Sequence, residues 1–142
     1  MLFRSICAAA YQGRVACVDR VSGNGAWARD LSALRGVDMD GRYVFVGDDH
    51  GALYAFERLR GGNAWKQEKL RDRRLSSPVA LAERYVAVGD YQGQIHLINA
   101  DDGAFAARAG TDGGAINGVM IPLKSGLVAQ TANGGVFAYR IQ

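Results

Sequence analysis

The chain has 142 residues, of which 49% are hydrophobic and 22% are charged, and this composition is ordinary for a folded globular protein. Nineteen glycines against two prolines indicate many tight turns rather than a disordered chain. The net charge of +3 is mild, and no aromatic residues are interleaved with the densest cationic run, so nucleic acid is not an expected partner.

A short pattern, glycine-x-apolar-x followed by two apolar or small residues, occurs four times in the chain. Its leading glycines are separated by 38, 42 and 41 residues, and they are Gly13, Gly51, Gly93 and Gly134. A period near forty residues that is built from short strands is typical of β-propeller blades. We therefore predict an all-β fold, and we expect each leading glycine to lie in a hairpin turn with a positive φ.

Other strands can be placed around each copy of this pattern. A second apolar run precedes each leading glycine and predicts a β-hairpin with it; these runs are 6–10, 43–48, 85–90 and 127–131. A third strand with an aromatic residue follows in three copies, at Trp27, Trp65 and Phe105. An inner first strand is predicted at 36–39, 78–81 and 118–121.

The strands group into four-stranded antiparallel blades, two of them complete and two partial. The predicted bounds are 6–33 (partial), 34–71, 77–110 and 117–142 (partial), all within one partial propeller spanning residues 1–142. About three and a half blades do not close a ring, so they leave uncovered blade faces and unpaired sheet edges. We therefore expect an incomplete arc that self-associates. The alternative is a small β-domain that folds independently.

The first five residues, Met-Leu-Phe-Arg-Ser, contain no apolar stretch long enough for a signal peptide. Leu-Phe-Arg-Ser is also the translation of a common sequencing adaptor, so we expect the native sequence to begin near Ile6. A lipoprotein cleavage box requires a small residue where Ile6 stands, and this argues against lipidation at Cys7.

The two histidines are the natural candidates for catalysis or metal binding. His50 occupies a hairpin-turn position, and His96 a mid-strand position, whose residues vary between the copies. Neither therefore belongs to a Ser/His/Asp or Cys/His constellation. The aspartates do not follow the spacing of a calcium loop, and no glycine-rich loop opens a helix. We predict no catalytic residue, no metal site and no cofactor.

The two cysteines, Cys7 and Cys17, lie on the two strands of the first predicted hairpin, almost symmetrically about its turn. In an oxidising compartment they could pair if the register brings their Cβ atoms close together. Direct neighbours across antiparallel strands are strained partners, however, and we favour two small buried thiols.

Two further groups of side chains recur or cluster. Trp27, Trp65 and Phe105 recur at the blade period, which favours packing between adjacent blades over a ligand-stacking set. The run from Lys66 to Arg74 carries five cations and two anions. A solvated strand and connector explains this run best, but an acidic protein or lipid headgroups are alternative partners. We take Arg71, Arg73 and Arg74 as the candidate partner-binding residues.

The segment Ala16-Cys-Val-Asp-Arg-Val-Ser-Gly-Asn-Gly-Ala-Trp27 resembles the PQQ-like propeller repeat, whose blades carry Ala-x-Asp-x-x-(Thr/Ser)-Gly-x-x-x-Trp. From Ser76 onward the chain is similar to the C-terminal blades of the BamB family, on the strings 75–79, 88–105 and 133–139. This resemblance covers essentially the whole chain from Ile6.

The resemblance implies an eight-bladed propeller of which this chain is the C-terminal portion. It further implies a non-enzymatic lipoprotein on the periplasmic face of the outer membrane in Gram-negative bacteria. That family docks on the periplasmic POTRA domains of BamA, within the β-barrel assembly machinery, and assists insertion of outer-membrane proteins. The family's best-known BamA-contacting loops and its lipidated cysteine have no counterpart in these residues.

Two other functions remain open. A PQQ-dependent quinoprotein dehydrogenase uses the same repeat, but it needs a vicinal cysteine pair, a calcium-binding carboxylate set and a catalytic aspartate. Cys7 and Cys17 are not vicinal, and no such set appears in this sequence. A generic interaction propeller is the third possibility, although the Gly-His and Trp-Asp pairs of the WD repeat are absent.

Overall fold

A computed structural model describes residues 4–142, and within them it contains fourteen β-strands and no helix. The predicted all-β fold of propeller blades is therefore confirmed. Of the five residues that we expected to precede the native start, the first three lie outside the described residues.

The strands form four separate antiparallel sheets in chain order, and each sheet is one blade. The first blade consists of β1 (Ser5–Ala9), β2 (Arg14–Asp19) and β3 (Gly25–Asp30). The second consists of β4 (Val37–Met39), β5 (Tyr43–Gly47), β6 (Leu53–Glu57) and β7 (Asn63–Gln67). The third consists of β8 (Val79–Leu81), β9 (Tyr85–Gly89), β10 (Gln94–Asn99) and β11 (Phe105–Gly110). The fourth consists of β12 (Ile121–Leu123), β13 (Gly126–Gln130) and β14 (Val136–Arg140).

One expected strand is displaced. We placed the inner strand of the fourth blade at 118–121, but β12 begins at Ile121 and pairs with β13 through Leu123. Met120 instead points into the core, fully buried, at the end of the connector that enters the blade. The apolar segment 118–121 therefore does supply a core residue, Met120, but most of it belongs to the connector and only Ile121 to the strand.

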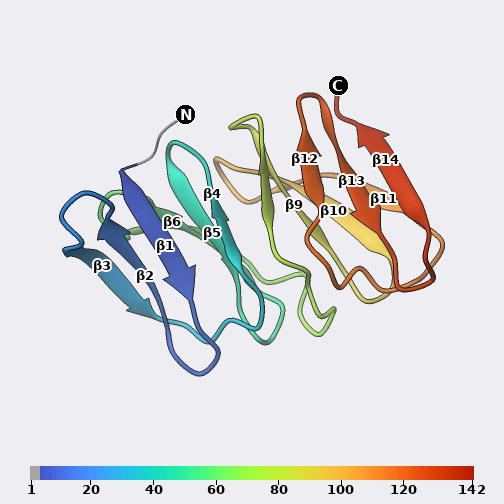
Figure 1. Ribbon diagram of the computed structural model, residues 1–142. Helices are drawn as coiled ribbons and strands as arrows, with labels where there is room; N and C mark the ends of the chain where they lie inside the picture. The colour runs from blue at the N-terminus through green and yellow to red at the C-terminus, as the bar shows by residue number, and fades with distance from the viewer. Residues whose placement is uncertain (1–3) are drawn as a thin grey trace.

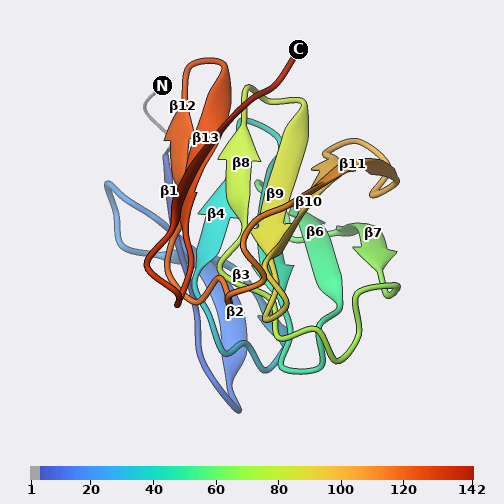
Figure 2. The same cartoon turned by 90° about the vertical axis from the view of Figure 1, so that its right-hand side faces the viewer.

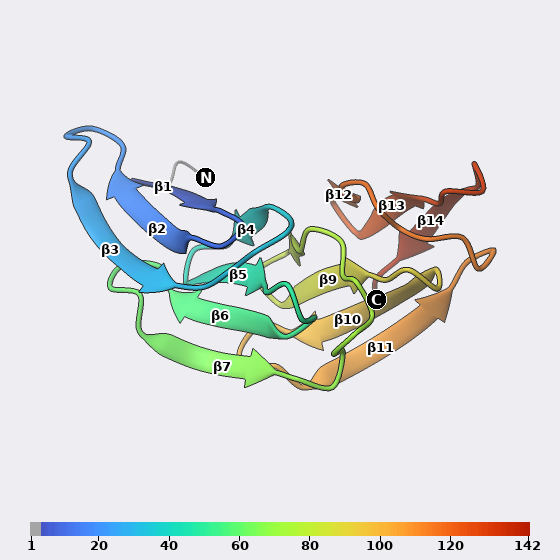
Figure 3. The same ribbon diagram turned by 90° about the horizontal axis from the view of Figure 1, so that it is seen from below.

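The four blades stand side by side along an open arc (Figure 1). Seen from below, the outermost strands β3, β7 and β11 line the convex side, and the short inner strands lie on the concave side (Figure 3). Figure 2 turns the fourth blade, one free end of the arc, toward the viewer. The inner strands β4, β8 and β12 adjoin one another in succession, and β1, the counterpart of β5, lies against β4.

The hydrophobic core is divided into three clusters, one for each interface between neighbouring blades. The first cluster joins Val15 and Cys17 to Val44 and Val46, and the second joins Phe45 and its neighbours to the third blade. The third cluster lies between the third and fourth blades. Side chains alternate along a strand, so β5 supplies both of its faces to the core, and this explains its nearly continuous apolar sequence.

The leading glycines follow the expected backbone in three blades only. Gly51, Gly93 and Gly134 have φ values of 92°, 79° and 88°. In the first hairpin the positive φ of 52° belongs to Gln12 instead, so the expectation is wrong at Gly13. The aspartates at the start of the next two turns accept amide hydrogen bonds there, whereas the first turn begins with Ala10, which has no side-chain acceptor.

Candidate functional site

The candidate site is formed at one end of each blade, where the hairpin turns after β1, β5, β9 and β13 meet the connectors between blades. We call this surface, which runs along the whole arc, the connector face. Backbone hydrogen bonds join each turn to a connector: Asp72 donates to the His50 carbonyl at 2.9 Å, and Tyr91 donates to the Arg73 carbonyl at 3.0 Å. Likewise, Ala132 donates to the Ala115 carbonyl at 2.8 Å. The connectors are therefore held by main-chain contacts, and rigid loops of this kind suit protein recognition.

A buried polar network anchors the second of these connectors to the third blade. Asp90 is fully buried, and its Oδ2 atom lies 2.9 Å from Nε2 of His96 and 3.1 Å from Nη1 of Arg73. Its Oδ1 atom accepts hydrogen bonds from the amides of Gln92 and Gln94. Every lone pair of the carboxylate therefore faces a donor, which is the condition under which a buried charge is tolerated.

The network fixes the protonation states of its members. Burial alone would raise the pKa of Asp90, but the hydrogen bonds from His96, two amides and Arg73 outweigh burial, and the net pKa is lowered. Burial lowers the pKa of His96, and the nearby Arg73 and Arg108 lower it further, against the opposing effect of Asp90. At neutral pH the carboxylate is thus charged, and a neutral imidazole donates to it.

The three arginines that we selected from the sequence do not act alike. Arg73 is the half-buried cation of this network, so it holds the connector in place. Arg71 is exposed and pairs with Glu68 at 3.1 Å, and Arg74 is exposed. Arg74 also lines a pocket of about 180 Å³, together with Leu34, Arg35, Asp48 and Asp49. Leu34 is 56% exposed. Of the three arginines, Arg71 and Arg74 are therefore the exposed ones, and Arg74 lines this pocket.

Away from the connector face, two tryptophans lock neighbouring blades together. Trp27 in the first blade donates from Nε1 to the Arg58 carbonyl of the second blade at 2.8 Å. Trp65 in the second blade donates to the Ala100 carbonyl of the third at 2.7 Å. In both cases the indole ring lies against a glycine with a positive φ, Gly61 or Gly103, where a Cβ atom would overlap the ring. Each lock therefore consists of an indole, a carbonyl and a glycine.

Phe105 does not occupy the position of these tryptophans. Trp27 pairs with Cys17, and Trp65 pairs with Ala55, but the equivalent residue of β10, Leu97, pairs with Ala107. Phe105 pairs with Ile98 and lies near His96, with 6.2 Å between ring centroids. Both tryptophans follow their turn glycine by four residues, and this spacing is the signal that would have identified Ala107.

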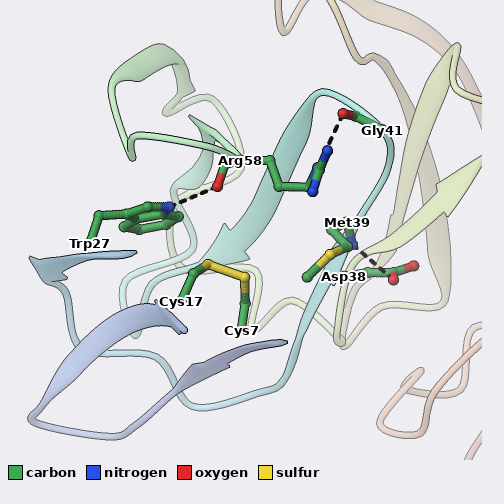
Figure 4. The surroundings of a disulfide bond; sticks show 7 residues. All are labelled: Cys7, Cys17, Trp27, Asp38, Met39, Gly41 and Arg58. Atoms are coloured by element: carbon green, nitrogen blue, oxygen red, sulfur yellow. Dashed lines mark hydrogen bonds between the residues drawn. A yellow bond between two sulfur atoms is a disulfide. The ribbon is translucent and has the colours of Figure 1, made fainter. Parts of the chain in front are cut away.

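The cysteines form a disulfide, so our preference for two free thiols was wrong (Figure 4). Cys7 and Cys17 are direct partners in the β1–β2 register, with 4.1 Å between their Cα atoms. The bond lies on the face of the first blade that packs against the second, near Trp27 and Met39 (Figure 4). The register thus brings the two sulfur atoms together, and the apolar pattern of the two strands does not by itself specify that register.

The remaining candidates form no reactive constellation. His50 lies exposed on its turn, 3.5 Å from a carboxylate oxygen of Asp49. Within residues 4–142 no group of three or more histidine, cysteine or acidic side chains is placed to hold a metal ion. The same part of the chain contains no helix that is long and apolar enough to span a membrane.

Comparisons of the sequence with known families give a consistent result. The sequence model described as "Outer membrane protein assembly factor BamB" matches residues 3–67 and 59–142. A relative of that name from Bordetella pertussis is 38% identical over 138 residues, covering 96% of this chain and 36% of its own length. The relative from Nitrosomonas eutropha is 42% identical over 137 residues, covering 96% of this chain and 34% of its own length. The chain therefore spans about a third of the curated relatives that it matches.

Solved structures support the same grouping. BamB from Moraxella catarrhalis superposes with a TM-score of 0.90 and 29% identity, over 99% of this chain and 41% of that one. The quinohemoprotein alcohol dehydrogenase from Comamonas testosteroni reaches a TM-score of 0.76 at 19% identity, over 92% of this chain and 28% of that one. The second likeness shows a shared propeller fold and carries no information on activity.

Proposed function

Because the chain belongs to the family of the outer membrane protein assembly factor BamB, we propose that it forms part of a non-catalytic scaffold for assembling outer-membrane proteins. In this role the blades do not turn over a substrate. They present rigid loops to the periplasmic POTRA domains of BamA, on the periplasmic side of the outer membrane. The observation that carries the proposal is the match of the family model along nearly the whole chain.

The connector face suits this role better than any other described surface. Its loops are pinned by main-chain hydrogen bonds and by the buried Asp90 network, so little conformational entropy is lost when a partner binds. The exposed cations Arg71 and Arg74 attract acidic surfaces, while Leu34 and the half-exposed Tyr91 add apolar contact area. In this proposal Arg73 acts indirectly, because it positions the connector that carries its two neighbours.

The direct test is binding of this chain to the purified periplasmic domains of BamA from the same organism, measured by biolayer interferometry at two salt concentrations. The double variant Arg71→Ala/Arg74→Ala should bind at least about fivefold more weakly than the parent, chiefly through slower association. The matched control is Arg60→Ala/Arg84→Ala, which removes two exposed arginines from turns at the opposite end of the blades.

Equal binding by the parent and both double variants would show that Arg71 and Arg74 do not contribute to the interface. No measurable binding by the parent chain would overturn the proposal that this region docks on BamA, while leaving its family membership untouched. Weakening by the control pair alone would place the interface at the opposite end of the blades.

A quinoprotein dehydrogenase is not favoured by any described side chain. The sequence identity of 19% to the solved dehydrogenase is too low to infer a shared activity from the shared fold. The two cysteines are not a vicinal pair but form a disulfide across a hairpin. We keep the dehydrogenase only as the alternative that a cofactor-binding assay on the longer protein would reveal.

Self-association is part of the same proposal for the isolated chain. The outer face of the fourth blade exposes Ile121, Leu123 and Val136, the last being 68% exposed, and no described blade packs against this face. Light scattering should then give a mass above the 15.2 kDa of one chain, and Val136→Glu should restore the monomer. A monomeric parent at every concentration tested would discard this part of the proposal.

A further inference from the structure

The chain contains three Asn-Gly pairs, which begin at Asn24, Asn117 and Asn133. In such a pair the amide nitrogen of the glycine can attack the side-chain carbonyl carbon of the asparagine, because glycine has no Cβ atom to hinder the approach. The attack needs an exposed pair, a glycine amide without a hydrogen-bond partner, and a main chain that is free to rotate at the asparagine. The fold treats the three pairs differently in all of these respects.

The pair at Asn133 is held in a hairpin turn. The Gly134 amide donates to the Thr131 carbonyl at 3.0 Å. The Asn133 side chain lies against Gly114, where an added Cβ atom would be 2.8 Å from the side-chain amide. Hydrogen bonds from the Gly114 amide and, to a lesser degree, from the Asn133 side chain lower the pKa of Asp112. The attacking nitrogen and the group that it would attack are therefore both engaged.

The pair at Asn24 is held by the β2–β3 ladder. The Asn24 carbonyl accepts a hydrogen bond from the Asp19 amide at 2.8 Å, and the Asn24 amide donates to Oγ of Ser22 at 3.2 Å. Gly25 is the first residue of β3 and pairs with Val18. Ring closure requires rotation about the bond between Cα and the carbonyl carbon of the asparagine, and these contacts oppose that rotation.

The pair at Asn117 has none of these restraints. Asn117 and Gly118 lie outside any strand, in the connector that enters the fourth blade, and both are exposed. Within residues 4–142 they form no hydrogen bond through either main chain or side chain. A Cβ atom at Gly118 would meet nothing within 4 Å, and the two residues line a surface hollow of about 170 Å³. Water and the attacking nitrogen therefore both have free access to this asparagine.

We propose that Asn117–Gly118 is a site of spontaneous deamidation, with water as the only co-reactant. The Gly118 nitrogen forms a bond to Cγ of Asn117, and the side-chain nitrogen leaves as ammonia together with the proton of the Gly118 amide. Water then opens the resulting succinimide ring at one of its two carbonyl carbons. Opening at Cγ gives aspartate with the normal main chain. Opening at the other carbonyl carbon gives isoaspartate, in which the main chain runs through Cβ and Cγ.

The isoaspartyl form should loosen the interface between the third and fourth blades. The main chain then gains one carbon atom between Ile116 and Met120, which are both buried in the core cluster of that interface. Ile116 fits tightly, since a Cβ atom at Gly89 would lie 2.6 Å from its side chain. A longer connector displaces at least one of these two anchors. The aspartyl form only adds a negative charge to the exposed connector face. This inference is independent of docking on BamA.

The reaction can be followed by peptide mapping with mass spectrometry on the folded chain, kept at a mildly alkaline pH that favours loss of the glycine amide proton. Asn117 should deamidate at least about fivefold faster than Asn24 and Asn133, on the order expected when one hydrogen bond must break first. In guanidinium chloride the three pairs should react at similar rates, because they share the same two residues. Equal rates in the folded chain would overturn the proposal.

Two glycine variants test the attacking nitrogen. Gly118→Ala places a Cβ atom beside this nitrogen in open space, so the protein should fold like the parent while deamidation at Asn117 slows by about tenfold. The matched control is Gly36→Ala in the connector that enters the second blade, where the added Cβ atom is 3.5 Å from Oγ of Ser77. This control should react like the parent. Parent-like deamidation in Gly118→Ala would also overturn the proposal.

The structural consequence has its own measurement. After the same incubation, the parent should show a second thermal transition at lower temperature, whereas Asn117→Gln should not, because glutamine closes the larger ring far more slowly. Fresh Asn117→Asp should melt like the fresh parent, since it carries the charge without the longer main chain. An incubated parent that contains isoaspartate but melts like fresh protein would refute the loosened interface.

Discussion

Asp48 and Asp90 occupy the same place in successive hairpin turns, yet only Asp90 carries a histidine and an arginine on its second carboxylate oxygen. Both accept two backbone amides through Oδ1, at 2.8–3.0 Å. Asp48 is partly exposed, whereas Asp90 is fully buried between blades. One turn has thus acquired a buried charge network that its neighbour in the repeat lacks.

This difference predicts unequal costs for the same substitution. Asp90→Ala leaves Arg73 and His96 without their acceptor and should lower the free energy of unfolding by about 3 kcal/mol. Asp48→Ala loses only the turn hydrogen bonds and should cost about 1 kcal/mol. Urea unfolding followed by tryptophan fluorescence measures both values. Equal costs would mean that the histidine and the arginine add nothing to the turn.

The network also predicts how stability changes with pH. The folded-state pKa values of His96 and Asp90 are both lowered, so the unfolded chain binds more protons than the folded chain as the pH falls. The contribution of His96 to stability should therefore be constant above the ordinary histidine pKa of about 6.5, and should decrease below it. A further decrease is expected as the pH falls below about 4, where the aspartate begins to take up protons in the unfolded chain.

The two histidines allow a matched test of this dependence. In His96→Gln the decrease in melting temperature between pH 7 and pH 5 should be smaller than in the parent, because no buried imidazole has to be protonated. His50→Gln, on an exposed turn, should behave like the parent. A parent-like pH profile in His96→Gln would assign the acid sensitivity to other groups.

The indole locks predict a contrast between two glycines with identical φ. Gly23→Ala and Gly103→Ala introduce the same backbone strain at 74°, about 1 kcal/mol each. The added Cβ atom at Gly103 also meets the Trp65 ring, so this variant should be less stable by about a further 2 kcal/mol. Thermal unfolding of the two variants side by side gives the difference, and equal melting temperatures would refute the lock.

The disulfide predicts a redox-dependent stability. Its loop is short, with a separation of 10 residues, so its removal should cost about 2–3 kcal/mol. Melting with and without dithiothreitol should show a decrease for the parent and no change for Cys7→Ala/Cys17→Ala. Thiol titration of the unfolded, unreduced chain should detect no free cysteine. Two reactive thiols there would show that the bond does not form.

The repeat explains why most of the fold can be predicted from the sequence. A glycine every forty residues, with an apolar run on either side, is enough to locate the hairpins β1–β2, β5–β6, β9–β10 and β13–β14. The failures occur where local pattern does not determine register. Phe105 matches Trp65 in residue type, although a shift of two residues along β11 gives that position to Ala107.

The buried network escapes sequence-based prediction for a related reason. His96 shares no chemistry with the equivalent residues Ala16 and Tyr54, so the repeat gives it no assigned role. Its partners come from a turn six residues earlier and from a connector more than twenty residues earlier, and only the packed blades bring the three together. Polar contacts of this kind depend on tertiary geometry, which a one-dimensional period does not encode.

Ala107 stands at the position that Trp27 and Trp65 occupy in the first two blades, so the three interfaces between blades are not stabilised in the same way. At the first and second interfaces between blades, an indole packs on a turn of the next blade and donates a hydrogen bond to it. At the third interface, the methyl group of Ala107 stands at the equivalent position and lines a pocket. A hydrogen bond from the Tyr139 hydroxyl to the Gly110 carbonyl spans that interface instead. We therefore expect the fourth blade to separate first under bending or pulling, while the other three blades move together.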